Sequence, residues 1–398
     1  MSHVVLVIPT IDRIGGAEQQ VLTLAHGLQR QGWRVTVVAL AGSGGAARQD
    51  LERDNIGYLS LEMRKGIVDP RGWLRLRAWL RHHKPDVVHA HLPHAVWMAR
   101  LARLLAPIPV VIDTIHTTAT GGPGRKFGYI FTRRLTDRVI AVSQAVADAY
   151  CRADIVDPQR LTVIPNSIDI KAWRKASDTR ATLRSEMCFG DEFVWLAAAR
   201  LEPVKDFPTM LRAFARLHSP ARLVIAGDGL ERQHLVSLAE RLGIARQVQF
   251  IGFVRDMLPL MQAADGFLLT SLWEGLPVAV LEAAACKLPP VATRVRGTCE
   301  VIEDGVTGLL AAPGDYADIA QAMNRMMAMS NEQRSAMGQR GFDKVKAQFS
   351  LETALDRHEA LYRGLLSSKR SAGRPASDSH EAVLQSPAPG KADASSRA

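Results

Sequence analysis

Two glutamates stand eight positions apart in the segment LWEGLPVAVLEAAA, on either side of a glycine and a proline. Proline fits the first turn of a helix, so the pattern predicts a helix from Pro277 to about Lys287. Glu274 then lies in the turn before this helix, and Glu282 lies inside it among apolar neighbours. A buried carboxylate needs partners, and a pair of ligand hydroxyl groups would satisfy Glu282. The alternative is that Glu274 offsets the helix dipole and Glu282 is a solvated surface acid.

Basic residues and glycines follow two other predicted strands. Arg200 ends the strand EFVWLAAAR, and Lys205 follows five positions later. Cations at the carboxyl end of a strand can neutralise a diphosphate as its charge develops. Gly15 and Gly16, in DRIGGAEQQ, open a helix whose first amides could approach a phosphate. A surface basic pair and a plain tight turn are the alternatives, and the glycines lack the spacing of a dinucleotide fingerprint.

The elements that must position these residues alternate along the chain as strand-like and helix-like segments, in two successive runs. This pattern predicts an α/β protein with two doubly wound parallel sheets, whose ligands bind in the cleft at the carboxyl ends of the strands. The chain of 398 residues also exceeds what one core usually supports. We expect a first domain over residues 1–175, a second over 176–348, an amphipathic helix over 349–366 and a disordered tail over 367–398.

The net charge of +10 is unevenly placed, because residues 1–175 hold 24 Lys and Arg against 14 Asp and Glu, whereas residues 176–398 hold 26 of each. This asymmetry predicts an acidic partner for the first half: nucleic acid, an anionic membrane or a phosphorylated substrate. No nucleic-acid-binding module is recognisable, so nucleic acid is not expected. The N-terminus lacks the pattern of a signal peptide, no apolar run is long enough to span a bilayer, and the four cysteines suit a reducing cytoplasm.

An ordered set of motifs extends the argument over nearly the whole chain. The set is GGAE after the first strand, VSQ at Ser143, IPNSID, the pair Arg200 and Lys205, GDG, EGLPVAVLE and TGLL. In this order the motifs resemble the retaining, GT-B fold glycosyltransferases of glycosyltransferase family 4. The resemblance implies two Rossmann-like domains, of which the first binds an acceptor and the second a nucleotide sugar.

The chain departs from the family pattern at three places. Asn166 and Ser167 stand where the family often has Asn-Gly, Lys287 stands where it has glycine, and the segment from Arg296 to Glu300 replaces a Gly-Gly before a glutamate. None of these departures touches the two glutamates or the two cations.

The resemblance also implies roles. Glu282 would receive the ribose hydroxyls of a nucleotide sugar, and Glu274 would bind the transferred sugar. Arg200, Lys205 and the Gly16 amide would hold the diphosphate in place of a metal, which fits the absence of an Asp-x-Asp motif. The expected catalytic residues are His116, Arg200, Lys205 and Glu274. The expected donor-binding residues are Gly15, Gly16, Gly227, Val254, Gly275, Leu276, Leu281 and Glu282.

His116, in DTIHTT at a strand end, matches the family's histidine near the donor sugar, although a lone histidine is more often structural. His89, His91 and His94 in HAHLPH raise the alternative of a metal site, since strand geometry places His89 and His91 on one face. The family has no metal there, so we expect none. We also expect no cofactor besides the nucleotide-sugar co-substrate, with UDP preferred over GDP.

The activity implied is transfer of a sugar, with retention of configuration, to a hydroxyl of a lipid-linked or cell-surface glycan intermediate in polysaccharide biosynthesis. The alternatives are a nucleotide-sugar 2-epimerase of the same fold, or a non-catalytic protein that binds nucleic acid or membrane. The expected location is cytoplasmic and peripheral, on the inner face of the cell membrane.

Two basic, aromatic segments of the first half suit an anionic membrane surface. One is RGWLRLRAWLRHHK (71–84), for which packing of the apolar face on the sheet is an equal alternative. The other is GRKFGYIFTRR (124–134), where an acceptor would enter. Its expected membrane and acceptor residues are Arg125, Lys126, Arg133 and Arg134.

Overall fold

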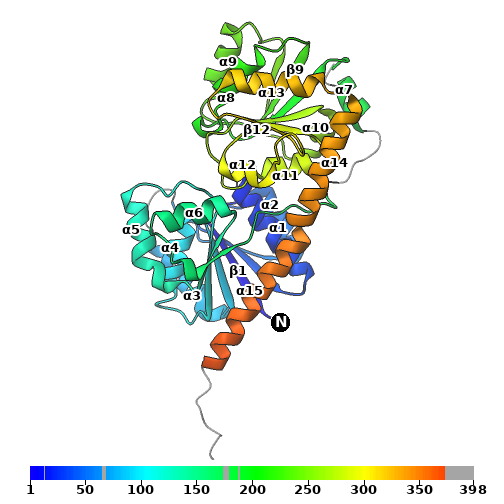
Figure 1. Cartoon of the computed structure of the whole chain (residues 1–398). Helices are drawn as coiled ribbons and strands as arrows, with labels where there is room; N and C mark the ends of the chain where they lie inside the picture. The colour runs from blue at the N-terminus through cyan, green and yellow to red at the C-terminus, as the bar shows by residue number, and fades with distance from the viewer. Residues whose placement is uncertain (13, 65–68, 174–178, 187–188, 373–398) are drawn as a thin grey trace, which may run out of the picture.

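The structure is a computed structural model that describes residues 1–12, 14–64, 69–173, 179–186 and 189–372. They form two α/β domains stacked end to end, each built on one parallel sheet (Figure 1). Within these ranges, no helix combines the length and the apolar character that crossing a bilayer demands.

The first domain contains a seven-stranded sheet in the order β3-β2-β1-β4-β5-β6-β7. Its strands are β1 (His3–Ile8), β2 (Arg34–Ala39), β3 (Gly57–Ser60), β4 (Val87–His91), β5 (Val110–Ile115), β6 (Arg138–Ala141) and β7 (Leu161–Val163). Its helices are α1 (Gly16–Arg30), α2 (Gly45–Arg53), α3 (Pro70–His83), α4 (Pro93–Ala102), α5 (Pro123–Thr132) and α6 (Gln144–Arg152). All strand pairs are parallel, and β1 is buried throughout because helices cover both faces of the sheet.

The second domain contains a six-stranded sheet in the order β10-β9-β8-β11-β12-β13. Its strands are β8 (Phe193–Ala198), β9 (Ala221–Ala226), β10 (Val248–Gly252), β11 (Gly266–Leu269), β12 (Pro290–Thr293) and β13 (Leu309–Ala311). Its helices are α7 (Thr179–Glu186), α8 (Phe207–Phe214), α9 (Arg232–Arg241), α10 (Leu258–Ala263), α11 (Val278–Ala285), α12 (Arg296–Val301), α13 (Tyr316–Ala328) and α14 (Asn331–Gln348). The prediction of two doubly wound parallel sheets is therefore confirmed.

The helix expected from Pro277 to Lys287 is α11. Pro277 precedes its first residue in an extended conformation, and the helix ends at Ala285. Lys287 has a left-handed backbone with φ of 58°, which stops the helix slightly before its predicted end. The left-handed conformation also explains why a glycine would suit this position.

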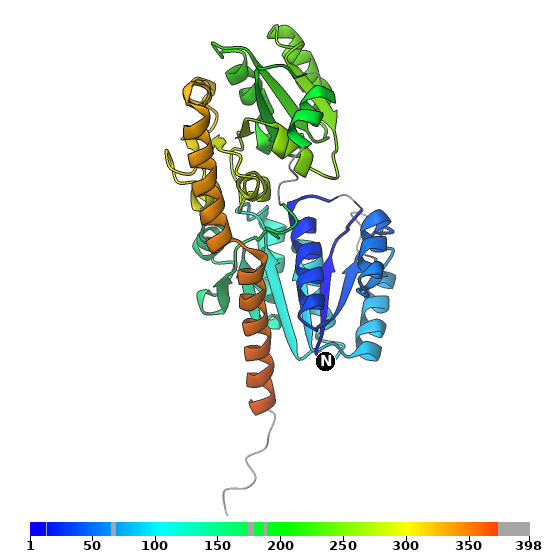
Figure 2. The same cartoon turned by 90° about the vertical axis from the view of Figure 1, so that its right-hand side faces the viewer.

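The last helix, α15 (Leu351–Ala372), crosses back to the first domain (Figure 2). Leu355 fills the space beside Gly27 of α1, and the rings of Tyr362 and Trp33 meet edge to face at 5.6 Å. The helix continues past its predicted end at residue 366, and Lys369 forms a 3.0 Å ion pair with Asp137. The prediction of a disordered tail is thus wrong for residues 367–372, and the rest of that tail lies outside the described residues.

Helix α3 contains the first candidate membrane segment. Leu76 and Leu80 are completely buried, and Trp79 packs against the same core while stacking on His83 at 4.1 Å. This helix connects two parallel strands, so its apolar face must cover the sheet. The membrane hypothesis for residues 71–84 is therefore wrong, and the alternative of packing on the sheet is correct.

Candidate active site in the interdomain cleft

Two helices from different domains begin next to each other. A Cβ atom on Gly16, at the start of α1, would lie 3.5 Å from Cγ2 of Val278, at the start of α11. Gly15 and Pro277 stand at the capping positions and supply no capping side chain, although the Glu18 carboxylate of α1 accepts a hydrogen bond from the Gly15 amide at 3.0 Å. The first amides of a helix lack intrahelical partners and carry a partial positive charge. The two helix ends together thus form a place where an anion is stabilised.

Two cations stand at this place. Nζ of Lys205 lies 2.5 Å from Oε1 of Glu274, and the Ser271 hydroxyl donates to the same oxygen at 2.6 Å. The side chains of Lys205 and Glu274 are only 21% and 11% exposed, so the pair is held in place. Arg200 is more exposed, at 68%, and its Nη1 forms a 2.9 Å ion pair with Glu202. Its Nε lies 3.9 Å from where a Cβ on Gly15 would be.

The turn that carries Glu274 touches the first domain directly. A Cβ on Gly275 would lie 2.3 Å from the carbonyl oxygen of His116, so only glycine fits this contact. The Asn166 side-chain amide donates to the Leu276 carbonyl at 3.0 Å. On the other side, Gly297 packs so closely that a Cβ there would lie 2.6 Å from the Glu274 carbonyl oxygen. His116 and Glu274, which the sequence placed in different domains, are therefore neighbours.

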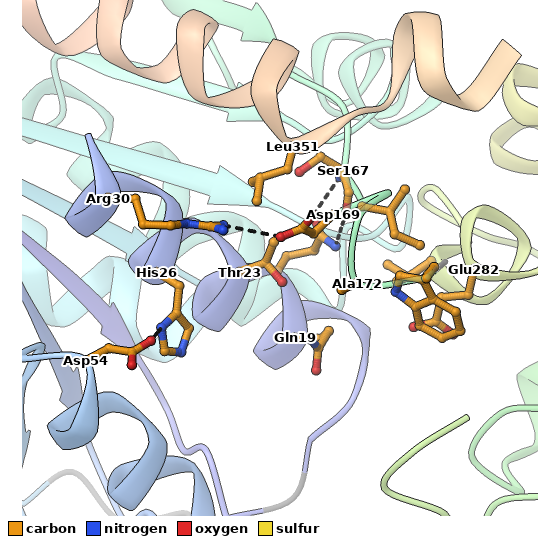
Figure 3. Close-up of a pocket in the computed structure, with 14 residues that line it drawn as sticks. Gln19, Thr23, His26, Arg30, Asp54, Ser167, Asp169, Ala172, Glu282 and Leu351 are labelled. Atoms are coloured by element: carbon orange, nitrogen blue, oxygen red, sulfur yellow. Dashed lines mark hydrogen bonds and ion pairs between the residues drawn. The ribbon is translucent and has the colours of Figure 1, made fainter. Parts of the chain in front are cut away.

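Glu282 follows one helical turn into α11, where its side chain is half-buried. No hydrogen-bond partner of its carboxyl group occurs within the described part of the chain, and burial raises its pKa to about 8. The group borders a cavity of about 360 Å³ between α1, α11 and the segment from Ser167 to Trp173 (Figure 3). Glu282 is thus a half-buried carboxyl group without a protein donor among the described residues, which favours its interpretation as a ligand-binding group over that of a solvated surface acid.

The other predicted donor residues lie at the carboxyl ends of the second sheet. The Gly227 amide donates to the Gly252 carbonyl at 2.7 Å, and Gly227 has a φ of 147° that suits glycine alone. Val254 follows β10 and is half-buried against the core. The side chains of Leu276 and Leu281 are buried, so these residues can offer a ligand only their backbone.

The three histidines considered for a metal site do not converge. Both ring nitrogens of His89 are already engaged, Nδ1 with the Tyr362 hydroxyl at 2.7 Å and Nε2 with the Thr114 hydroxyl at 2.6 Å. His94 is exposed and packs edge to face on Trp97. In the ranges that the structure describes, no group of three or more His, Cys, Asp or Glu side chains could hold a metal ion.

Sequence reasoning missed the contacts that close the cleft. The Glu300 carboxylate accepts hydrogen bonds from the backbone amides of Gln144 at 3.0 Å and Ala145 at 2.8 Å, at the start of α6. Next to it, Arg296 and Asp148 form a 3.4 Å ion pair between the domains. Arg296 and Glu300 both lie in the segment that departs from the family pattern. Nothing in the sequence, however, identifies the residues of the first domain that they contact.

A cleft between two parallel sheets, lined by helix starts, cations and carboxylates, defines a GT-B glycosyltransferase site. Residues 14–172 match the family described as Glycosyltransferase Family 4, and residues 180–344 match the family described as Glycosyl transferases group 1. The chain belongs to glycosyltransferase family 4. The interpretation as a non-catalytic binding protein is therefore wrong.

Named relatives agree with this assignment. The UDP-Gal:alpha-D-GlcNAc-diphosphoundecaprenol alpha-1,3-galactosyltransferase of Escherichia coli is 26% identical over 76% of this chain and 81% of its own length. The lipopolysaccharide core biosynthesis glycosyltransferase LpsE of Rhizobium meliloti is 29% identical over 89% of this chain and 96% of its own. The crystal structure of Anabaena Alr3699/HepE in complex with UDP-glucose shares the fold, with a TM-score of 0.81, 23% identity and coverage of 92% and 100%. These relatives give no support to the epimerase alternative.

Proposed function

We propose that this enzyme transfers a sugar from a UDP-sugar to a hydroxyl group of a lipid-linked or cell-surface glycan intermediate, with retention of configuration. The observation that carries the proposal is the meeting, in one cleft, of the starts of α1 and α11, the cations Arg200 and Lys205, and the carboxyl groups of Glu274 and Glu282. The relatives named for UDP-Gal and diphosphoundecaprenol, and for the lipopolysaccharide core, support this donor and these acceptors. In this proposal residues 1–175 bind the acceptor and residues 176–348 bind the nucleotide sugar.

The two glutamates have different roles in the proposed reaction. Glu282 receives the ribose hydroxyls, since it is desolvated and has no donor of its own among the described residues. Glu274 binds hydroxyls of the transferred sugar next to His116, whose backbone touches the same turn. Replacing Glu282 by alanine should mainly weaken nucleotide binding, and replacing Glu274 by alanine should mainly slow turnover. If both variants bind UDP and turn over like the parent, the assignment of roles is refuted.

The diphosphate is held by Arg200, Lys205 and the first amides of α1 and α11, with no metal required. In the transfer step the bond between the anomeric carbon and the diphosphate oxygen breaks, while the acceptor oxygen bonds to the same face of that carbon. The acceptor proton passes to the departing diphosphate, whose growing negative charge is offset by the two cations. The proposal predicts full activity in chelator-treated buffer, and a strict dependence on added divalent metal would contradict it.

A donor panel tests the substrate class. Ligand binding to the folded state raises its apparent stability, so the thermal unfolding midpoint is measured with UDP-sugars and GDP-sugars at equal concentration. UDP-sugars should give the larger shift. Product analysis with and without an acceptor, together with the anomeric configuration of the product, separates retaining transfer from inversion, hydrolysis and epimerisation. Equal shifts for both nucleotide classes would contradict the preference for UDP.

We also propose that the first domain docks on an anionic membrane through α5, in a cytoplasmic, peripheral location. Phe127 and Phe131 are 68% and 75% exposed and stack on each other at 5.7 Å, with Ile130 exposed beside them. Arg133 and Arg134 follow directly and are exposed. An exposed aromatic pair beside cations suits the boundary between water and acyl chains. Arg125 and Lys126 are half-buried, so in this proposal they have a smaller share of the membrane contact than Arg133 and Arg134.

Liposome co-sedimentation tests the docking surface. The parent should bind anionic but not neutral vesicles, and salt should weaken the binding. Phe127→Ser with Phe131→Ser should abolish it, whereas Leu74→Ser, at another exposed apolar position on α3, should not. Equal binding to both vesicle types, or to neither, would refute the docking surface.

A further inference from the structure

Four histidines, three of them buried and the fourth, His116, half-buried, form a row from the crossing helix α15 to the candidate active site. The rings of His358 and His89 lie 5.8 Å apart, those of His89 and His91 lie 4.2 Å apart, and those of His91 and His116 lie 5.4 Å apart. Burial lowers the pKa of His91 well below its ordinary value and that of His116 to about 4. Both rings are therefore neutral at neutral pH, and each carries one proton.

One hydrogen bond joins the last two rings, with Nδ1 of His91 lying 3.1 Å from Nε2 of His116. The outer nitrogens, Nε2 of His91 and Nδ1 of His116, are buried and lack partners within the described residues. Because the bond contains one proton, the second proton must lie on one of these two outer nitrogens. The tautomer of His116 thus depends on the tautomer of His91.

The surroundings of the two rings decide between the alternatives. His91 is 2% exposed on β4, so an N–H at its Nε2 would be a buried donor without an acceptor, which native structures avoid. His116 is half-buried at the strand end that touches Gly275 of the second domain. Nδ1 of His116 is also covered in the ligand-free structure, but its ring is half-buried beside the cleft whereas that of His91 is buried, so His116 is the ring that a bound ligand can approach.

We propose that His91 is a positioning residue whose Nδ1–H donates to Nε2 of His116, so that His116 presents its Nδ1–H to an acceptor oxygen of the bound donor sugar. The catalytic consequence rests on the proposed function, which places the sugar next to His116. The arrangement is anchored from outside the active site. The ring of His89 packs against that of His91 at an interplanar angle of 36°, and His89 is itself held by Tyr362 of α15 and by Thr114 of β5.

Two substitutions of His91 separate positioning from packing. His91→Asn keeps a side-chain amide that can donate to Nε2 of His116, whereas His91→Leu keeps apolar volume and removes the donor. We expect His91→Leu to lower kcat by about ten- to a hundredfold, by analogy with the loss of partners that orient metal-binding histidines, and we expect His91→Asn to retain most of the activity. A packing role predicts the reverse order, because leucine fills a buried site better than an unpaired amide. His218→Leu, at an exposed histidine of the second domain, is the matched control.

The tautomer is read directly from long-range proton–nitrogen correlations of ¹⁵N-histidine-labelled protein, with the His116 signal assigned from its loss in His116→Asn. The parent should show His116 protonated at Nδ1, and His91→Leu should shift it toward Nε2. An Nε2–H tautomer in the parent, or a fully active His91→Leu variant, would overturn the proposal. If His116→Asn is fully active, the sugar contact of the proposed function fails, while the NMR result still decides whether His91 sets the tautomer.

Discussion

Replacing Glu282 by glutamine is expected to stabilise the ligand-free enzyme. The carboxyl group has no hydrogen-bond partner in the part of the chain that the structure describes, and desolvation raises its pKa from 4.5 to about 8. A group with a raised pKa favours the folded state below its unfolded pKa, and this contribution is lost as pH rises through the folded pKa. Glutamine has a similar shape and is neutral at every pH, so it avoids the loss.

The size of the effect follows from the same shift. Each pH unit above the unfolded pKa, up to the folded pKa, lowers the free energy of unfolding by about 1.4 kcal/mol. At about pH 7 the parent is therefore roughly 3 kcal/mol less stable than it would be with a neutral side chain at this position. The stability difference between Glu282→Gln and the parent should therefore be near zero at about pH 4.5, grow with pH, and level off above about pH 8. Partial exposure of the side chain makes this an upper figure.

Denaturant unfolding across this pH range measures the difference, with Glu240→Gln as the control because Glu240 lies on the exposed face of α9. Above about pH 8, where the parent's carboxylate is ionised, the affinity of the same variant for UDP should be lower than the parent's, since a charge-assisted hydrogen bond to a ribose hydroxyl contributes about 1.5 to 3 kcal/mol. A variant that is less stable than the parent above about pH 7, or whose difference does not change with pH, would refute the reasoning.

Three further outcomes are expected. Lys205→Ala should lower kcat by roughly a hundredfold, about 3 kcal/mol, because a preorganised cation is lost, and activity within threefold of the parent would remove Lys205 from the mechanism. Arg100→Leu should destabilise the first domain by about 3 to 5 kcal/mol, because the completely buried Asp113, which pairs with Arg100 at 2.7 Å, would lose its cationic partner. An unchanged thermal unfolding midpoint would contradict this. Glu300→Gln should weaken the contact between the domains and raise the KM for the donor about fivefold, since it removes the negative charge that caps α6. Small-angle scattering that detects no expansion of this variant would contradict the prediction.

Local patterns determined much of what the structure contains. The run HVVLVI is apolar at nearly every position because a central parallel strand is covered on both faces, and it forms β1 as expected. Pro277 and the apolar residues after it specify α11, so the places of Glu274 and Glu282 could be predicted. The strand ends that carry Arg200, Lys205 and His116 follow from the same alternation, because active residues of such sheets collect at the carboxyl ends of strands.

Only the tertiary structure decided which faces and which partners these elements have. Helices α3 and α5 have the same mixture of aromatic and basic residues, yet α3 is buried on its apolar side and α5 exposes Phe127 and Phe131. Periodicity shows that a helix has an apolar face but not what covers it, because that depends on where the chain returns.

The same reason applies between the domains. By itself the sequence determined two parallel sheets, the helix that carries Glu282 and the residue types of the cleft. The contact of Gly275 with His116, the capping of α6 by Glu300, and the bond from His91 to His116 each join residues far apart in the chain. Such pairs have no sequence signature, because they form only when the two sheets and the crossing helix α15 pack together. The energy of that packing is distributed over many apolar contacts, so neither residue of a pair reveals its partner.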